Sequence, residues 1–347
     1  FVRNHELVST DDSGGAFAMG FGSKDGGFVP GGTTHVILDA KTLTVTDQFR
    51  SLGGTIRNCS GGVTPWNTWL TCEESTTGPG RKFGEGLVKN HGWVFEVPAN
   101  ARGLIAPEPL YALGRFNHEA ACVDPETGFV YMTEDRDDSV LYRFIPKQAG
   151  QLAMGGRLQA MQVVDAPDLR NWSATSLRPS GVSAVNWLDL DDVESPKDDL
   201  RHRARAKGAS LIARGEGIHM AQGEAYICST SGGAARLGQI LRLHLSDTGE
   251  HDRLELFFES VSTRQFNFGD NLTVAPNGHL VVCEDQYTAK VDNFRRGITP
   301  EGHAYPLARL RLQTELAGAC FSPDGTTLFV NVYKPNKPLA ITGTWDR

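Results

Sequence analysis

The fold is predicted most clearly by one stretch, Ala-Pro-Asn-Gly-His-Leu-Val-Val-Cys-Glu-Asp at residues 275–285. Its Pro, Asn and Gly residues favour a tight turn, and the apolar run at 280–282 favours a short β-strand. The strand then ends on two acids, Glu284 and Asp285. The stretch therefore predicts a turn, a buried strand and a carboxylate-rich strand end, in that order.

The same order of turn, strand and polar end recurs along the chain. Two clear copies occupy residues 124–135 and 322–333, and looser copies occupy 69–74 and 225–230. Their spacing fits four-stranded propeller blades of about 40–50 residues, with insertions in the longer gaps. Further strands are expected at 34–39, 140–144 and 240–244.

We therefore predict an all-β chain that folds as a β-propeller, six-bladed, with residues 1–347 in a single domain. The chain has 39 glycines among 347 residues, above the average of roughly 7%, which agrees with many tight turns. The alternative is a pair of β-sandwiches, because both architectures use short strands joined by turns.

Composition excludes several classes of protein. No apolar run approaches the roughly 18 residues of a membrane-spanning helix. The net charge of -7 argues against nucleic acid as a partner. The chain begins at Phe1 without a basic and apolar leader, so we expect any export signal to have been removed.

One segment, residues 189–212, breaks the strand pattern because it begins acidic and turns basic. We interpret it as an insertion between blades whose second half forms a short helix. Its charges are expected to form a solvated face rather than a binding site.

Common catalytic motifs are missing from the sequence. It contains no phosphate-binding P-loop, no complete dinucleotide fingerprint, no G-x-S-x-G elbow, no C-x-x-C pair and no H-E-x-x-H. The recurring strand-end acids suggest a different chemistry. In a propeller such residues converge on the central channel, where several carboxylates need cations to coexist. Carboxylate oxygens favour Ca²⁺, Mg²⁺ or Mn²⁺.

Cys72 sharpens this interpretation. It lies beside Glu73 and Glu74, where other blades place their acids, and a thiolate among carboxylates favours a transition metal such as iron. The alternative is that Cys72 is a small apolar residue of the core. We predict that core role for Cys122 and Cys320, and leave it open for Cys228 and Cys283.

Three polar motifs precede predicted strands. Asn-His-Glu occurs twice, ending in Glu6 and in Glu119, and each Glu is expected to project from a loop at the channel mouth. Arg214 lies two residues before Glu216, and its guanidinium suits bidentate binding of phosphate. The alternative for each glutamate is an ordinary exposed side chain.

Together these residues resemble the PhoX-type alkaline phosphatase family. The run Trp-Leu-Thr-Cys-Glu-Glu is the most specific part, and Asn67 stands before it where the family commonly has Gly. The motifs that carry the resemblance are residues 3–6, 64–74, 114–119, 214–217, 270–272 and 283–285.

The resemblance implies a six-bladed propeller that hydrolyses phosphomonoesters at a mixed Fe³⁺ and Ca²⁺ centre, with metal-bound oxide or hydroxide as the nucleophile. It also implies export to the periplasm or secretion, and we expect a monomer acting on small phosphate esters. Carried over by motif, Cys72 and Glu216 are iron ligands and Arg214 holds the phosphate. The other implied metal ligands are Glu6, Glu119, Glu284 and Asp285, with Glu73, Glu134 and Asp135 as secondary candidates.

Two other functions fit the sequence. One is a calcium-dependent propeller that hydrolyses esters or lactones, which needs no thiolate ligand. The other is a propeller that binds a partner or phosphate without turnover.

Overall fold

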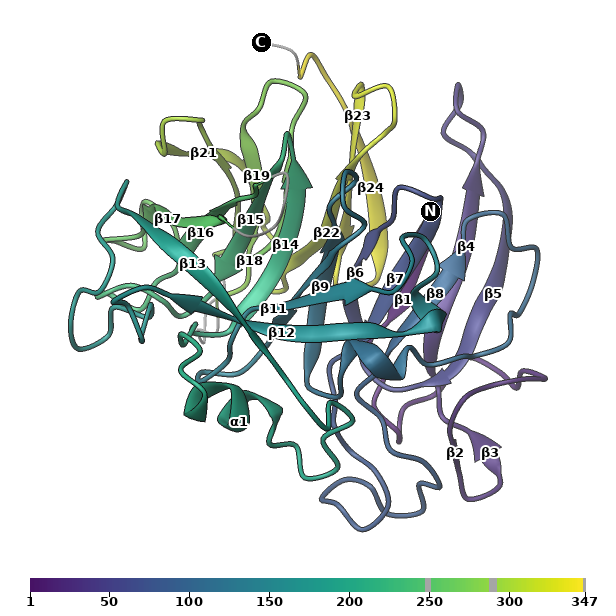
Figure 1. Cartoon of the computed structure of the whole chain (residues 1–347). Coiled ribbons are helices and arrows are strands. Elements are labelled where there is room, and N and C mark those ends of the chain that lie inside the picture. The colour runs from purple at the N-terminus through teal and green to yellow at the C-terminus, as the bar shows by residue number, and fades with distance from the viewer. Residues whose placement is uncertain (247–250, 287–291, 346–347) are drawn as a thin grey trace. The chain divides into compact units, whose positions relative to one another are not determined.

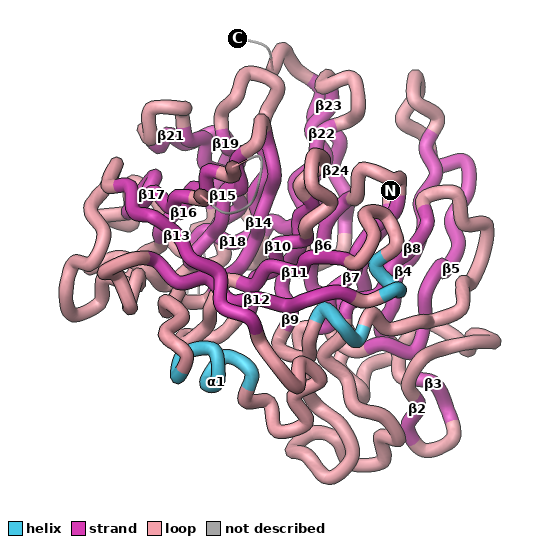
Figure 2. The backbone as a smooth tube through the Cα atoms, viewed as in Figure 1, coloured by secondary structure: helices cyan, strands magenta, loops and turns pink. Residues whose placement is uncertain are grey.

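Antiparallel strands dominate the computed structural model, which describes residues 1–246, 251–286 and 292–345 (Figures 1 and 2). The chain divides into two compact units. Unit 1 comprises residues 1–135, 141–160 and 187–207, and unit 2 comprises 136–140, 161–186 and 208–347.

Unit 1 contains three antiparallel meanders, in which each strand pairs with the next along the sheet. Their strands are β1 (Val2–His5), β4 (Gly31–Leu38) and β5 (Val45–Thr55); β6 (Asn58–Val63), β7 (Thr68–Glu73) and β8 (Val94–Pro98); and β9 (His118–Val123), β10 (Val130–Glu134), β11 (Tyr142–Pro146) and β12 (Gly156–Val163). Residues 156–160 of β12 belong to this unit. Unit 1 also contains a small hairpin of β2 (Ser23–Lys24) and β3 (Gly27–Phe28), two single-turn 3₁₀ helices, η1 (Tyr111–Leu113) and η2 (Leu152–Met154), and the helix α1 (Leu200–Ala206).

Unit 2 also contains three antiparallel meanders. The first has β14 (Gly215–Ala221), β15 (Glu224–Ser229), β16 (Gln239–His244) and β17 (Arg253–Glu259). β13 (Val182–Asp189), of which residues 182–186 belong to this unit, pairs with β17. The second has β18 (Gly269–Val274), β19 (Leu280–Glu284), β20 (Phe294–Ile298) and β21 (Ala304–Arg309), and the third has β22 (Leu316–Phe321), β23 (Thr327–Val332) and β24 (Lys337–Thr342).

The turn-and-strand pattern of the sequence is confirmed in both units. Each predicted strand after a turn is the second strand of a meander, in β7, β10, β15, β19 and β23. Within each unit, the first strands of neighbouring meanders contact one another, as blades of a propeller do: β1 with β6, β6 with β9, β14 with β18, and β18 with β22. The all-β fold is therefore confirmed, whereas a closed ring of six blades and a single domain over 1–347 stay predictions.

The cysteines show where burial could and could not be predicted. Cys122 is buried in β9, as predicted for a core residue. The same prediction is wrong for Cys320, which is exposed in β22 because the strand alternation turns Ala319 inward instead. Cys228 and Cys283 are both buried, and burial raises the pKa of the Cys283 thiol to about 11.

The segment at 189–212 contains the predicted short helix, α1 (Leu200–Ala206), which buries Leu200 and Ala204. The acidic and basic parts of the segment pair with one another: Lys207 contacts Asp191 at 2.9 Å, and Arg203 contacts Asp199 at 3.2 Å. Its charges thus neutralise each other locally, in agreement with a solvated face. No helix in the described residues is long and apolar enough to cross a membrane.

Candidate metal centre

A β-bulge recurs at the start of the first strand in four meanders. In β6, for example, Asn58 pairs with Glu73 and the next pair is Gly61 with Thr71, so two residues of β6 stand opposite one of β7. The same shift occurs at the start of β9, β14 and β18. A bulge re-aims side chains while the strand continues. The first residue of the bulge is Cys59 in β6, Glu119 in β9, Glu216 in β14 and Asp270 in β18.

This geometry corrects one expectation. The sequence predicts Glu119 in a loop, yet it lies within β9, and Glu216 likewise lies within β14. The bulge explains the difference, because it lets a ligand-type side chain leave the ladder without ending the strand.

In each of these four meanders, the residue that follows the second strand donates a backbone hydrogen bond to the residue just before the first strand. The amide of Glu74 donates to the carbonyl of Arg57 at 2.9 Å, and the amide of Asp285 donates to that of Phe268 at 2.8 Å. Arg57, Arg214 and Phe268 all have positive φ, a conformation that is uncommon for residues other than glycine. The equivalent bonds elsewhere run from Asp135 to Asn117 and from Thr230 to Arg214.

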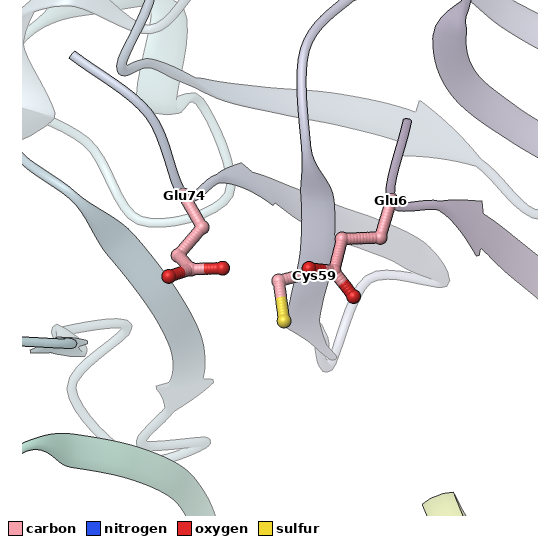
Figure 3. Close-up of side chains that lie close together, drawn as sticks. All are labelled: Glu6, Cys59 and Glu74. Carbon is pink, nitrogen blue, oxygen red and sulfur yellow. The ribbon is translucent and has the colours of Figure 1, made fainter. Parts of the chain in front are cut away.

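In unit 1 this arrangement gathers Glu6, Cys59 and Glu74, whose ligand atoms all lie within 4.8 Å of one another. Glu6 follows β1, Cys59 lies in the β6 bulge, and Glu74 follows β7. Figure 3 shows the Cys59 thiol between the two glutamate side chains. One thiol with two carboxylates is a donor set that fits a transition metal such as iron better than Ca²⁺ alone.

Arg57 provides the positive charge in this cluster. Its Nη2 lies 3.0 Å from Glu6 Oε1 and 2.5 Å from Glu74 Oε2. Burial alone would lower the pKa of Arg57, but Glu74 and Glu6 outweigh it and raise that pKa overall. Two carboxylates and a guanidinium thus share the volume that a cation would need.

Unit 2 holds a second cluster, formed by Asp270, Asp285 and Glu315, whose ligand atoms also lie within 4.8 Å of one another. Asp270 lies in the β18 bulge, Asp285 follows β19, and Glu315 precedes β22. All three donors are carboxylate oxygens, which fit a hard cation such as Ca²⁺.

The two adjacent acids at the end of β19 have different surroundings. Glu284 is fully buried, and its oxygens accept hydrogen bonds from the amides of Asn267 and Phe294 and from Arg296 Nε. Burial nonetheless raises the pKa of Glu284. Its neighbour Asp285, by contrast, joins the cluster. Glu73 and Glu134 are buried like Glu284.

Cys72 is separate from both clusters in the described residues. Its side chain is fully buried in β7, and burial together with nearby Glu119 raises the pKa of its thiol well above the usual value. A ligand role for Cys72 stays a prediction, and Cys59 is the cysteine that lies among carboxylates. Sequence reasoning also missed Glu74, Asp270 and Glu315; the adjacent acids in 73–74 and 284–285 were the available signal.

Arg214 and Glu216 lie together in unit 2, with Arg214 Nη2 2.7 Å from Glu216 Oε1. Glu216 is buried whereas Arg214 remains partly exposed. The pair therefore presents a guanidinium that a carboxylate orients, a geometry suited to an anion.

Comparison with known proteins supports the fold. A family model described as alkaline phosphatase PhoX matches residues 31–336. A search of curated proteins gave no match. The solved structure of Pseudomonas fluorescens PhoX in complex with vanadate, a transition state analogue, is 21% identical with a TM-score of 0.64, covering 86% of this chain and 67% of that one. Its likeness shows that the present chain has the fold of that β-propeller.

Two other solved structures are more distant. A putative 6-phosphogluconolactonase from Bacteroides uniformis is 10% identical with a TM-score of 0.45, covering 90% of this chain and 74% of that one. The Pseudomonas aeruginosa periplasmic gluconolactonase is 13% identical with a TM-score of 0.46, with the same coverage of each chain.

Proposed function

The chain belongs to the alkaline phosphatase PhoX family, and from this premise we propose that it hydrolyses small phosphomonoesters with metal ions held by its strand-end side chains. The observation that carries the proposal is the repeated bulge. It gives four meanders a ligand-type side chain at one equivalent position: Cys59, Glu119, Glu216 and Asp270.

The donor sets suggest how the metals are divided. Glu6, Cys59 and Glu74 would hold iron, with Cys72 as the alternative thiol. Asp270, Asp285 and Glu315 would hold calcium. Glu119 and Glu216 are further ligands, and Glu284 would position Asp285 from the interior. Bound ions of this kind supply Lewis acidity toward phosphate oxygens and toward water.

Arg214 would bind the phosphate group of the substrate. Arg214 Nη2 donates a hydrogen bond to Glu216 Oε1, so the guanidinium is already oriented before the phosphate group binds. This orientation reduces the ordering cost of binding and places positive charge where negative charge develops.

Replacing Arg214 with Ala is expected to lower kcat/KM for p-nitrophenyl phosphate by about 10²–10³-fold, the usual loss for one preorganised charge stabiliser. Arg214→Lys should recover only part of this, because an ammonium lacks the bidentate fork. The measurement is steady-state kinetics with inhibition by inorganic phosphate, with circular dichroism to confirm folding. Wild-type kinetics in Arg214→Ala would remove Arg214 from the site.

The proposed activity is tested by metal removal. Protein purified without chelator should contain iron and calcium and should hydrolyse p-nitrophenyl phosphate. Chelation should abolish turnover, and iron with calcium should restore it, because the proposed chemistry depends on the Lewis acidity of the bound ions. Calcium alone with lactone turnover, or phosphate binding without turnover, would contradict the phosphatase assignment.

We place the protein in the periplasm or outside the cell, acting as a monomer on small phosphate esters. Its six meanders would form one propeller domain over residues 1–347 with the insertion at 189–212.

A further inference from the structure

Arg57 occupies the same structural position as Arg214. Each residue has positive φ, with φ of 47° and 49°. Each carbonyl accepts the amide of the residue after the second strand, from Glu74 and from Thr230 respectively. Each guanidinium also contacts a nearby carboxylate of its own unit, since Arg57 meets Glu6 and Arg214 meets Glu216. The two arginines therefore share the same backbone conformation, the same backbone hydrogen bond and the same kind of ion pair.

The contacts of Arg57 differ from those of Arg214 in one respect. Arg57 spans two carboxylates of the Glu6–Cys59–Glu74 cluster, so it compensates the negative charge that a cation would otherwise neutralise. A metal ion bound by the same oxygens would remove both ion pairs and repel the guanidinium. The side chain is 35% exposed, so it has solvent into which it can turn.

The backbone allows such a movement. The Arg57 amide donates to the carbonyl of Leu7, and its carbonyl accepts the Glu74 amide, so the main chain stays fixed while the side chain rotates. A fixed Cα with a long side chain can deliver the guanidinium to an anion beside the cluster. Arg214 already has this use in the proposed function.

We propose that Arg57 is an exchangeable counter-ion: it neutralises the Glu6–Cys59–Glu74 cluster when no metal is bound, yields to a cation, and then binds the phosphate group of the substrate. The inference rests on the proposed function. It makes Arg57 a substrate-binding residue that metal loading exposes.

The first test is a titration of metal-free protein with Co²⁺, followed by the absorption that cobalt acquires from a thiolate ligand. Arg57→Gln should bind Co²⁺ about tenfold more tightly than wild type, since the cation no longer displaces two ion pairs. Arg57→Lys keeps the charge and should stay close to wild type. Arg157→Gln is the matched control, because it removes one positive charge from the exposed Arg157–Asp189 pair of the same unit.

The second test is binding of inorganic phosphate to the metal-loaded proteins by calorimetry. Arg57→Gln should bind phosphate about tenfold more weakly than wild type, although it binds metal more tightly. Unchanged or weaker Co²⁺ affinity in Arg57→Gln overturns the inference, and so does unchanged phosphate affinity. A wild-type protein that gives no thiolate absorption would overturn the proposed metal site itself, and the inference with it.

Discussion

Replacing Cys59 with Ser should remove iron from the protein and lower phosphomonoesterase activity by at least about 100-fold, whereas Cys72→Ala should keep both. Cys59 lies between Glu6 and Glu74, with ligand atoms within 4.8 Å. Its loss removes the soft donor that selects a transition metal over calcium. Cys72 is a fully buried side chain whose raised thiol pKa favours the neutral form. Its truncation should cost about 1 kcal/mol of folding stability.

The two cysteines can be compared in matched measurements. Iron content by elemental analysis and the visible charge-transfer absorption of iron bound to thiolate report the ligand directly, and kcat/KM reports the consequence. Thermal unfolding shows whether each variant is folded. Loss of iron from Cys72→Ala with retention in Cys59→Ser would reverse the assignment and restore the ligand role that the sequence motif implies for Cys72.

The sequence predicts the strands because turn chemistry is local. Residues 275–285 contain their turn, their strand and their acids within eleven positions, and β19 begins at Leu280 as expected. The second strands β7, β10, β15 and β23 of four other meanders are predicted from their local sequence in the same way. Sequence spacing therefore identifies five strand ends without knowledge of any pairing.

The ligand positions could not be predicted in this way, because they depend on pairing between strands. Cys59 is followed by Ser and two glycines, so nothing in its own neighbourhood predicts a strand. It becomes a candidate ligand only when the β6–β7 register places it in the bulge. Glu315 is similar, since its place beside Asp285 depends on the contact between β19 and β22. Spacing locates a strand end but does not tell which acid faces the core.

Substitutions of the adjacent residues Glu73 and Glu74 should have opposite effects, because Glu73 faces the core and Glu74 faces the metal cluster. Glu73→Ala should lower the free energy of unfolding of the metal-free protein by about 3–5 kcal/mol, the usual cost of breaking a buried charged network. Glu74→Gln should change that free energy by about 1 kcal/mol or less, but should weaken transition-metal binding by about 10–100-fold or more. Urea unfolding and metal titration measure the two effects.

The reason lies in what each carboxylate contacts. Glu73 Oε1 accepts the Ile56 amide at 2.8 Å and lies 2.6 Å from His91 Nδ1, while Oε2 accepts the amides of Gly92 and Trp93. Truncation leaves three buried amides without an acceptor, and each costs about 1–3 kcal/mol.

Glu74, by contrast, contacts Arg57 and accepts a hydrogen bond from Asn117 Nδ2, and a Gln side chain keeps its shape and one acceptor oxygen. Equal stability of the two variants, with equal loss of metal, would show that the pair acts as one site. The division between a carboxylate that holds the fold and a carboxylate that holds the metal would then be wrong for β7, and by the same geometry for Glu284 and Asp285 in β19.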